Sequence, residues 1–372
     1  MGPLKGLKII EVSAIGPGPY CGMMLADMGA DLVCVDRAIP PILDPATDCT
    51  RRGKRSIVLD LKSKHGYEIF HGLLERADAV FEGFRPGVME NLGLGPAECM
   101  AVNPRLVYGR MTGWGQTGPL SQVAGHDINY ISLTGLLHAI GRSGEKPVPP
   151  LNVVGDFGGG AMFLAFGMVC ALLETQKSGK GQVIDAAMTD GSALLMALFH
   201  SLKAQGMWTD ERGSNMLDSG AHYYDVYETS DGKYVSIGSI EPRFYSLLIE
   251  KAGLDAVEFA DQNDPERWPD LKKKLESVFR SRSRQQWCEL LEGTDVCFAP
   301  VLDINEAPLH PHNIERGTYI EVGGMTQPAP APRFSRTIPE VVSAAHEPGS
   351  DLETVLNDWN ISGKTGEDHD DF

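Results

Sequence analysis

Short apolar runs alternate with segments of helical spacing through the first half of the chain. Five of these runs are predicted to be strands: residues 7–12, 31–36, 56–61, 78–84 and 105–111. Residues 19–30 and 64–77 have the apolar spacing of helices between strands. Further along, 157–175 and 190–204 predict long apolar helices on either side of a strand at 182–188. Alternating strands and helices predict a mainly parallel sheet covered by helices.

The pattern changes near residue 222. Two alternating stretches flank Ser230-Asp231-Gly232, and Asp-Gly favours the tight turn of a β-hairpin. Charged helices follow over about 242–292. The expected fold is therefore α/β, with a Rossmann-like sheet in a large domain and a smaller α+β domain. We expect a large domain at 1–190, a linker helix region at 191–221, a small domain at 222–310 and a C-terminal segment at 311–372 that returns to the large domain.

Composition narrows the classes of partner. The 372 residues carry a formal net charge of −17, and an acidic surface is repelled by the phosphates of nucleic acids and anionic lipids. The apolar run at 158–173 stops at Glu174, short of the roughly 20 residues that span a bilayer. We therefore expect neither nucleic acid nor membrane as a partner.

Cysteines and terminal sequences point to a reducing compartment. The seven cysteines are scattered and form no C-x-x-C pair, which predicts reduced side chains and no metal site. Glu11 interrupts the only apolar stretch near the N-terminus, so no secretory signal is expected, and the C-terminal EDHDDF reads as a solvated acidic tail. The expected location is the cytoplasm.

Asp156 is one candidate for chemistry. It stands between an apolar run and the three glycines at 158–160, where an Asp commonly caps a helix. A helix N-terminus also offers free N–H groups and the positive end of a dipole, which can stabilise a developing oxyanion. The residue is therefore either a structural cap or an acid–base group.

His126 is the second candidate. It follows Ala124-Gly125 at the start of a helix-like segment, and a lone histidine in that place is more often a cap or a core residue. Two carboxylates, those of Asp127 and Glu241, could orient or charge its ring.

Basic residues gather in the first third of the chain, at positions Arg37, Arg51, Arg52, Lys54, Arg55, Lys62 and Arg85. Such a run is commonly a solvated face. In so acidic a chain it also fits a site for the phosphates of a nucleotide-like ligand. The loop SAIGPGP lacks the glycine spacing of a dinucleotide site, and SGKGQV lacks that of a P-loop, so NAD binding and a P-loop are not expected.

Seven phrases of the chain, taken in order, resemble motifs of the family III CoA-transferase superfamily, and within it the α-methylacyl-CoA racemases, most of all the bacterial enzymes. They are LKIIEVSAIGPGPYCGMMLADMGADLV, FEGFRPGVMENLGLGP, MTGWGQTGP, AGHDINYISLTGLLHAIG, PPLNVVGDFGGG, SGKGQVIDAAMTDG and NMLDSGAHYYDVYETSDGKYVSIGSIEPRFY. The resemblance implies an interlocked homodimer with its active site between subunits. It also implies an acyl-CoA thioester substrate, with CoA as part of the substrate and no separate cofactor.

The resemblance also assigns residues. It makes His126 and Asp156 the acid–base pair, with Asp127 and Glu241 beside them. The implied CoA and substrate contacts are Arg37, Leu59, Lys62, Gly83, Phe84, Arg85, Gly125, Tyr130, Asn152 and Tyr224. This chain departs from the pattern at His222, where relatives commonly have Pro, and at Asn91, where they often have Arg.

These assignments predict a racemase/epimerase that interconverts (2R)- and (2S)-2-methylacyl-CoA by 1,1-proton transfer. One group removes the α-proton from one face while the other delivers a proton to the opposite face. Backbone N–H groups at the Asp156 helix start are expected to hold the enolate, and a buried, apolar setting to raise the pKa of Asp156.

Two alternatives remain at this point. A transferase would use Asp156 as a covalent nucleophile, although that branch typically lacks the His of AGHD. A non-catalytic CoA-binding dimer is the other alternative.

Overall fold

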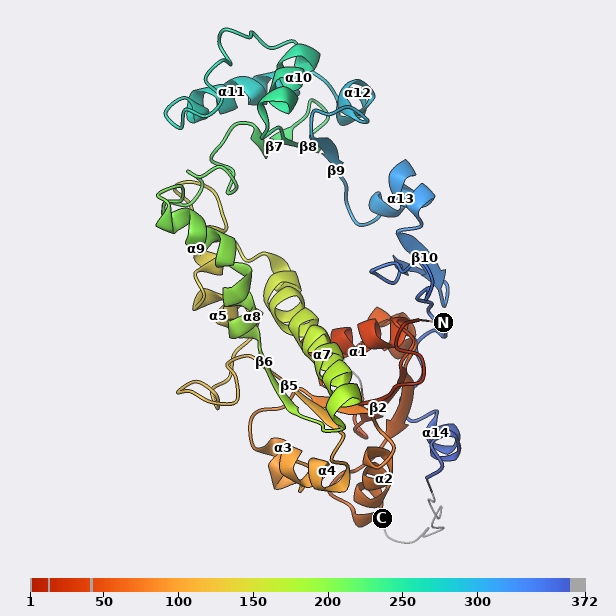
Figure 1. The fold of residues 1–372 in the computed structure, drawn as a ribbon. Helices are drawn as coiled ribbons and strands as arrows, with labels where there is room; N and C mark the ends of the chain where they lie inside the picture. Colours follow the sequence, from red (N-terminus) through yellow and green to blue (C-terminus); the bar gives the residue numbers. More distant parts are fainter. Residues whose placement is uncertain (1, 13, 41–42, 362–372) are drawn as a thin grey trace. The chain divides into compact units, whose positions relative to one another are not determined.

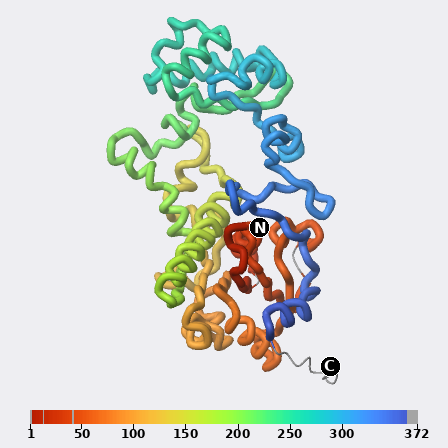
Figure 2. Tube along the Cα trace, turned by 45° about the vertical axis from the view of Figure 1, so that its right-hand side comes forward, coloured from red at the N-terminus to blue at the C-terminus, as the bar shows by residue number. Residues whose placement is uncertain are grey.

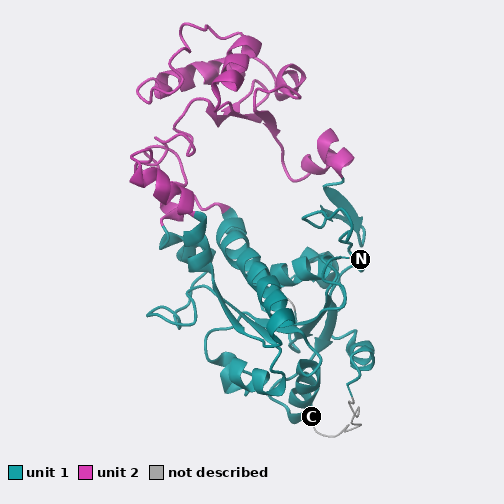
Figure 3. Ribbon diagram, viewed as in Figure 1, with its two compact units in different colours: residues 1–134, 151–195, 317–372 teal, residues 135–150, 196–316 magenta. Residues whose placement is uncertain are grey.

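The computed structural model describes residues 2–12, 14–40 and 43–361, which divide into two compact units. Unit 1 comprises residues 1–134, 151–195 and 317–372, and unit 2 comprises 135–150 and 196–316 (Figure 3). Residues 135–150, which we expected in the large domain, belong to unit 2. The C-terminal EDHDDF lies outside the described residues.

Unit 1 is built on a parallel sheet of six strands in the order β3-β2-β1-β4-β5-β6 (Figure 1). The strands are β1 (Lys8–Val12), β2 (Asp31–Asp36), β3 (Arg55–Val58), β4 (Ala79–Glu82), β5 (Val107–Thr112) and β6 (Val183–Ala187). All pairings are parallel, with Ile10 opposite both Val33 and Val80. The predicted mainly parallel α/β sheet is confirmed.

Helices cover both faces of this sheet. On one face α1 (Pro17–Asp27) and α7 (Met162–Ser178) pack around Phe81 and Val107. The opposite face is covered by α2 (Lys64–Leu74), α4 (Pro96–Val102) and α14 (Leu352–Asp358). The short helix α3 (Val88–Asn91) lies between α2 and α4 in the chain. The shorter helices of unit 1 are η1 (Pro45–Thr47), η2 (Cys49–Arg51), α5 (Asp127–Ser132), η3 (Leu151–Val153) and α8 (Met188–Leu195).

The first predicted long apolar helix differs from its expectation at the start. Residues Val154–Ala161 form a π-helix, η4, which α7 continues. Four glycines in η4 allow close packing by α8: a Cβ on Gly159 would lie 2.8 Å from the backbone N of Ser192. The second predicted helix, 190–204, divides at Met196 into α8 and α9 (Ala197–Ala204).

The run Leu151–Ser178 is helical throughout and is long and apolar enough to cross a membrane, a test that core helices of soluble proteins also pass. Its α7 part buries one face, including Leu164 and Met168. Its opposite face exposes large apolar residues: Met162, Phe166, Val169 and Leu173. The run at 158–173, which was expected to stop short of a membrane span, thus lies in a longer helix that buries one face and exposes the other.

The C-terminal part of unit 1 returns to the edge strand β3 (Figure 2). Ser56 of β3 donates its N–H to the Asp351 carboxylate at 2.8 Å, and the N–H of Asp351 donates back to the Ser56 carbonyl at 3.0 Å. Trp359 is fully buried and donates its indole N–H to Asp31 of β2 at 2.8 Å. A hairpin of β10 (Tyr319–Val322) and β11 (Met325–Pro328) precedes this segment.

Unit 2 has its own core around a three-stranded antiparallel sheet in the order β7-β8-β9. The strands are β7 (Tyr224–Glu228), β8 (Tyr234–Gly238) and β9 (Phe298–Val301), so the predicted hairpin is present. The remaining helices of unit 2 are α6 (Leu136–Ala139), α10 (Pro242–Ala252), α11 (Trp268–Phe279), α12 (Arg284–Leu291), η5 (Ala307–Leu309) and α13 (Pro311–Arg316).

Candidate active site

A cavity of about 340 Å³ at the carboxyl ends of β4 and β5 brings both acid–base candidates to one place. We call it the His126 pocket. Its predicted members are Gly83, Phe84, Arg85, Gly125, His126, Tyr130 and Asp156. Carboxyl ends of parallel strands are the usual place for ligand sites in open α/β sheets.

His126 occupies the N-cap position of α5 with an extended backbone (φ −132°, ψ 174°). Its N–H donates to Asn129 Oδ1 at 3.1 Å, and its carbonyl accepts from the Asn129 N–H at 2.8 Å. The imidazole is exposed and lines the pocket. The backbone of His126 thus starts the helix, while its ring stays available to a ligand.

Asp156 lies within η4, so the N-cap interpretation is wrong. Its own N–H donates to Asp127 Oδ1 at 2.7 Å and is therefore not free to bind an enolate oxygen, contrary to the expectation for this group. Gly155 makes this contact possible, because a Cβ there would lie 2.2 Å from the same Asp127 oxygen. The buried carboxylate of Asp127 holds the backbone of Asp156 in place.

The surroundings of the Asp156 side chain raise the pKa of its carboxyl. Burial raises the pKa of this carboxyl, and the nearby Asp127 raises it further. A hydrogen bond of 3.1 Å from Asn152 Nδ2 to Asp156 Oδ2, together with His126, opposes the increase. The result is a carboxyl with a raised pKa that can hold a proton at a higher pH than an ordinary Asp.

The loop after β1 also reaches Asp156. Gly16 has a φ of +72°, and a Cβ on it would lie 3.3 Å from Asp156 Oδ2. Glycine suits this backbone conformation and this close approach. Gly16 and Ile15, which also line the His126 pocket, were missed by the sequence reasoning, although the Gly-Pro repeat at 16–19 was a signal of an unusual turn.

The expected CoA contacts are distributed over neighbouring strand ends. Gly83, Phe84 and Arg85 follow β4, and the Arg37 guanidinium after β2 lies 6.0 Å from the centre of the Phe84 ring. Lys62 is exposed beyond β3, whereas Leu59 is buried in the core. Lys62 and Leu59 line neither the His126 pocket nor the second cavity described next.

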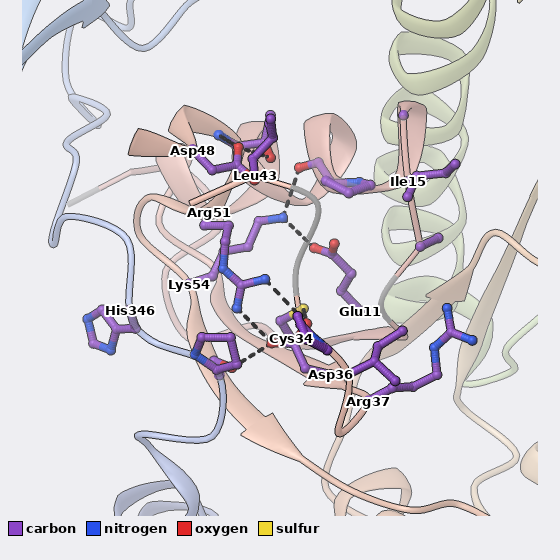
Figure 4. A pocket seen from close by; sticks show the side chains of 18 of the residues that line it. Glu11, Ile15, Cys34, Asp36, Arg37, Leu43, Asp48, Arg51, Lys54 and His346 are labelled. Atoms are coloured by element: carbon purple, nitrogen blue, oxygen red, sulfur yellow. Dashed lines mark hydrogen bonds and ion pairs between the residues drawn. The ribbon is translucent and has the colours of Figure 1, made fainter. Parts of the chain in front are cut away.

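A second cavity, of about 430 Å³, shares the lining residues Ile15 and Gly16 with the first. Figure 4 shows this second cavity from close by. We call it the Lys54 pocket. Arg37, Ile39, Leu43 and His346 line it, and buried ion pairs contribute to its wall. These pairs are Lys54 Nζ to Glu11 at 2.5 Å and Arg51 to Asp36 at 2.6 Å.

The basic residues at 51–55 do not form a solvent-exposed face, and their side chains are not available to bind phosphate groups. Arg52 and Lys54 are 3% and 4% exposed, and Arg52 pairs with Asp27 at 2.6 Å. Arg55 pairs with Asp31 at 2.6 Å. Within residues 2–12, 14–40 and 43–361, in contrast, Arg37, Lys62 and Arg85 form no ion pair.

The two remaining predicted residues belong to unit 2. Glu241 is exposed at the N-cap of α10, where its carbonyl accepts from the N–H groups of Phe244 and Tyr245. Tyr224 begins β7 with 36% of its surface exposed. His222 is fully buried in the core of unit 2, bonded through Nε2 to the Tyr245 hydroxyl at 2.7 Å, and burial lowers its pKa to about 4.

Comparisons with known proteins agree with this arrangement. The model of "CoA-transferase family III" matches residues 4–351. The mouse and human proteins named alpha-methylacyl-CoA racemase are 44% and 43% identical to this chain, over 96% of it and 94% of each relative. A crystal structure of a CAIB/BAIF family protein from Brucella suis superposes with a TM-score of 0.83 at 25% identity, covering 96% of this chain and 99% of that one.

Proposed function

This chain belongs to CoA-transferase family III, and we propose that within the family it is an α-methylacyl-CoA racemase that interconverts (2R)- and (2S)-2-methylacyl-CoA. The observation that carries the proposal is a histidine and a carboxyl with a raised pKa in one pocket. Racemisation needs two groups of similar basicity, one on each face of the α-carbon. A raised pKa brings Asp156 closer to the range of histidine.

The proton moves in both directions between the same groups. A neutral His126 removes the α-proton of one enantiomer, and protonated Asp156 delivers a proton to the opposite face of the enolate. For the other enantiomer an ionised Asp156 removes the proton and a protonated His126 delivers one. Each turnover leaves the pair ready for the reverse reaction.

CoA enters as part of the substrate, and its phosphates are bound by cations that form no ion pair within residues 2–12, 14–40 and 43–361. Arg37 and Arg85 flank Phe84 beside the His126 pocket, and Lys62 follows β3 in the chain. Charge-assisted bonds from Arg and Lys suit phosphate oxygens. Of the eleven Lys and Arg residues up to Arg85, the four at 51–55 are excluded from this role because each pairs with a carboxylate of the protein.

The alternative reaction, CoA transfer through a covalent bond to Asp156, is disfavoured by the same electrostatics. A nucleophilic carboxylate must be ionised, and burial together with Asp127 raises the pKa of Asp156, which lowers the ionised fraction at a given pH. One carboxyl oxygen, Oδ2, is also engaged by Asn152. Both features suit proton transfer better than nucleophilic attack.

The active protein is a homodimer, and the exposed face of α7 supports this assignment. Met162, Phe166, Val169 and Leu173 follow one another at intervals of four, three and four residues, so they lie on one side of the helix. Contiguous apolar surface of this kind marks an interface. Light scattering should give about twice the 40.4 kDa chain mass at low micromolar concentration, and an active monomer would contradict the assignment.

The racemase proposal is tested with one enantiomer of a 2-methylacyl-CoA in D2O and no acceptor acid. We expect racemisation with deuterium at the α-carbon. His126→Ala and Asp156→Ala should each lower racemisation by about 10²- to 10⁴-fold, the usual contribution of a positioned acid or base. Turnover that needs a second carboxylic acid would select the transferase instead, and binding without turnover would select a non-catalytic protein.

A further inference from the structure

Two aromatic side chains hold the loop that leads into His126. The Tyr130 hydroxyl donates a hydrogen bond to the Gly125 carbonyl, and the Trp114 indole N–H donates to the Val123 carbonyl at 3.1 Å. Two carbonyls of the segment from Val123 to His126 are thus fixed from outside the segment. The Gly125 carbonyl belongs to the peptide unit whose N–H is that of His126.

The two rings are themselves tightly packed. Tyr130 is 8% exposed, and its ring meets that of Trp114 edge to face at 4.8 Å with an interplanar angle of 85°. Glycines at 113 and 125 provide the space, since a Cβ would lie 2.0 Å and 2.8 Å, respectively, from Cε1 of the Tyr130 ring. The ring therefore lies directly against the backbone before His126, and neither glycine can be replaced without moving it.

Asp156 is positioned by a different set of contacts. Its backbone N–H is held by Asp127 and its carboxyl by Asn152. Neither of these hydrogen bonds involves Trp114 or Tyr130. The two acid–base residues thus have separate supports, although both supports include residues of α5.

We propose that Trp114 and Tyr130 form a clamp that positions His126 and leaves the position of Asp156 unaffected. The inference rests on the racemase function proposed above. It changes the role of Tyr130: the sequence resemblance implied a substrate contact, whereas the hydroxyl proton is used within the protein on Gly125. Both aromatic residues are positioning residues that act through His126.

The test measures α-proton exchange in D2O separately for each enantiomer. The enantiomer that faces His126 is defined as the one whose exchange His126→Ala abolishes. In Tyr130→Phe, which keeps the ring and removes the hydroxyl, exchange of that enantiomer should fall on the order of 10- to 100-fold, because a small misplacement of a catalytic group is costly. Exchange of the other enantiomer should stay within about two-fold, with KM unchanged for both.

A matched control and a second variant accompany this measurement. Tyr67 also donates its hydroxyl to a glycine carbonyl, that of Gly93 at 3.3 Å, but it lies on α2 and outside the His126 pocket. Tyr67→Phe should leave exchange of both enantiomers unchanged. Trp114→Phe removes the indole N–H and should change exchange in the same direction as Tyr130→Phe.

The outcomes distinguish a failure of the clamp proposal from a failure of the racemase proposal on which it rests. Equal losses for both enantiomers in Tyr130→Phe and Trp114→Phe would overturn the clamp and indicate a general role in binding or folding. Unchanged exchange in both variants would overturn it as well. If the wild-type protein exchanges neither enantiomer, it is the racemase proposal that fails.

Discussion

Two carboxyls of unit 1 are buried beside different partners: Glu11 in the Lys54 pocket and Asp156 in the His126 pocket. Burial raises the pKa of both. Glu11 has an ammonium group at 2.5 Å that opposes the increase, whereas Asp156 has a neutral amide at 3.1 Å and a second carboxylate nearby. A cationic partner fixes a buried carboxyl in its charged form. The difference indicates structural use in the first pocket and proton exchange in the second.

The same distinction separates the cations. Arg51, Arg52 and Lys54 are committed to buried carboxylates, and Arg85 has no such partner among the described residues. Removing a committed charge should therefore damage the fold, and removing an uncommitted one should damage binding. Substitutions of the paired and of the unpaired cations can test this distinction.

The largest change in stability is expected from Lys54→Met. This substitution leaves Glu11 buried without its cation and should lower the free energy of unfolding by about 3 to 5 kcal/mol, measured by urea denaturation. The double variant Glu11→Leu/Lys54→Met should recover much of the loss, because no uncompensated charge remains. Lys64→Met, which removes an exposed pair with Glu68, should change the same quantity by less than about 1 kcal/mol. Equal effects of Lys54→Met and Lys64→Met would contradict the structural assignment.

A smaller effect, on binding and not on folding, is expected from Arg85→Ala. The loss of a charge-assisted bond should weaken binding of a CoA ester by about 1.5 to 3 kcal/mol in isothermal titration calorimetry. Unfolding should be unchanged, since Arg85 is exposed and forms no ion pair within the described chain. Arg55→Ala is the counterpart and should lower stability while CoA binding stays constant. Unchanged affinity in Arg37→Ala, Lys62→Ala and Arg85→Ala would place the nucleotide elsewhere.

His222 extends the comparison to a buried titratable group with no charged partner bonded to it. Its pKa of about 4 in the folded protein is below the value of about 6.5 expected in the unfolded chain. The neutral ring therefore contributes fully above pH 6.5, and stability is lost as pH falls toward 4. Between pH 7 and 5 the loss should be on the order of 1 to 2 kcal/mol in urea denaturation. The slope should disappear in His222→Phe and remain in a variant of the exposed His65.

The smallest effect is expected from Asn152→Ala. The Asn152 amide lowers the pKa of Asp156, so its removal should raise that pKa further. In a pH profile of exchange, the limb that reports ionisation of Asp156 should move to higher pH, while CoA affinity stays the same. A shift to lower pH would mean that the amide stabilises the protonated carboxyl.

The sheet of unit 1 could be predicted from the sequence because its strands are short apolar runs separated by helical spacing. Strand 31–36 was predicted with the observed bounds, and 7–12 differs from β1 by one residue. Buried parallel strands carry this signal locally, without reference to distant parts of the chain. The family motifs pointed in addition to residues that the structure brings to one pocket.

Features that depend on contacts between distant residues could not be predicted from the sequence. The π-helix around Asp156 depends on α8 packing against Gly159 and on Asp127 accepting the Asp156 N–H, neither of which a run of glycines reveals. The cations at 51–55 seemed available for phosphates because their partners lie elsewhere in the chain, such as Glu11, 43 residues from Lys54, and Asp358, 303 residues from Arg55. Pairing across the fold decides whether a charge is available, and spacing in the sequence does not report it.

The return of residues 343–359 to β3 has a consequence for how the chain is made. Ser56 and Asp31 emerge early in synthesis, but their partners Asp351 and Trp359 follow only about 300 residues later. At about 5 to 20 residues per second, the first strands wait roughly 15 to 60 s for the segment that closes their edge. An uncovered edge strand is a template for pairing with another chain. Until the C-terminal segment arrives, β3 is therefore an uncovered edge, and its contact with Asp351 removes that edge as a site for pairing with another chain.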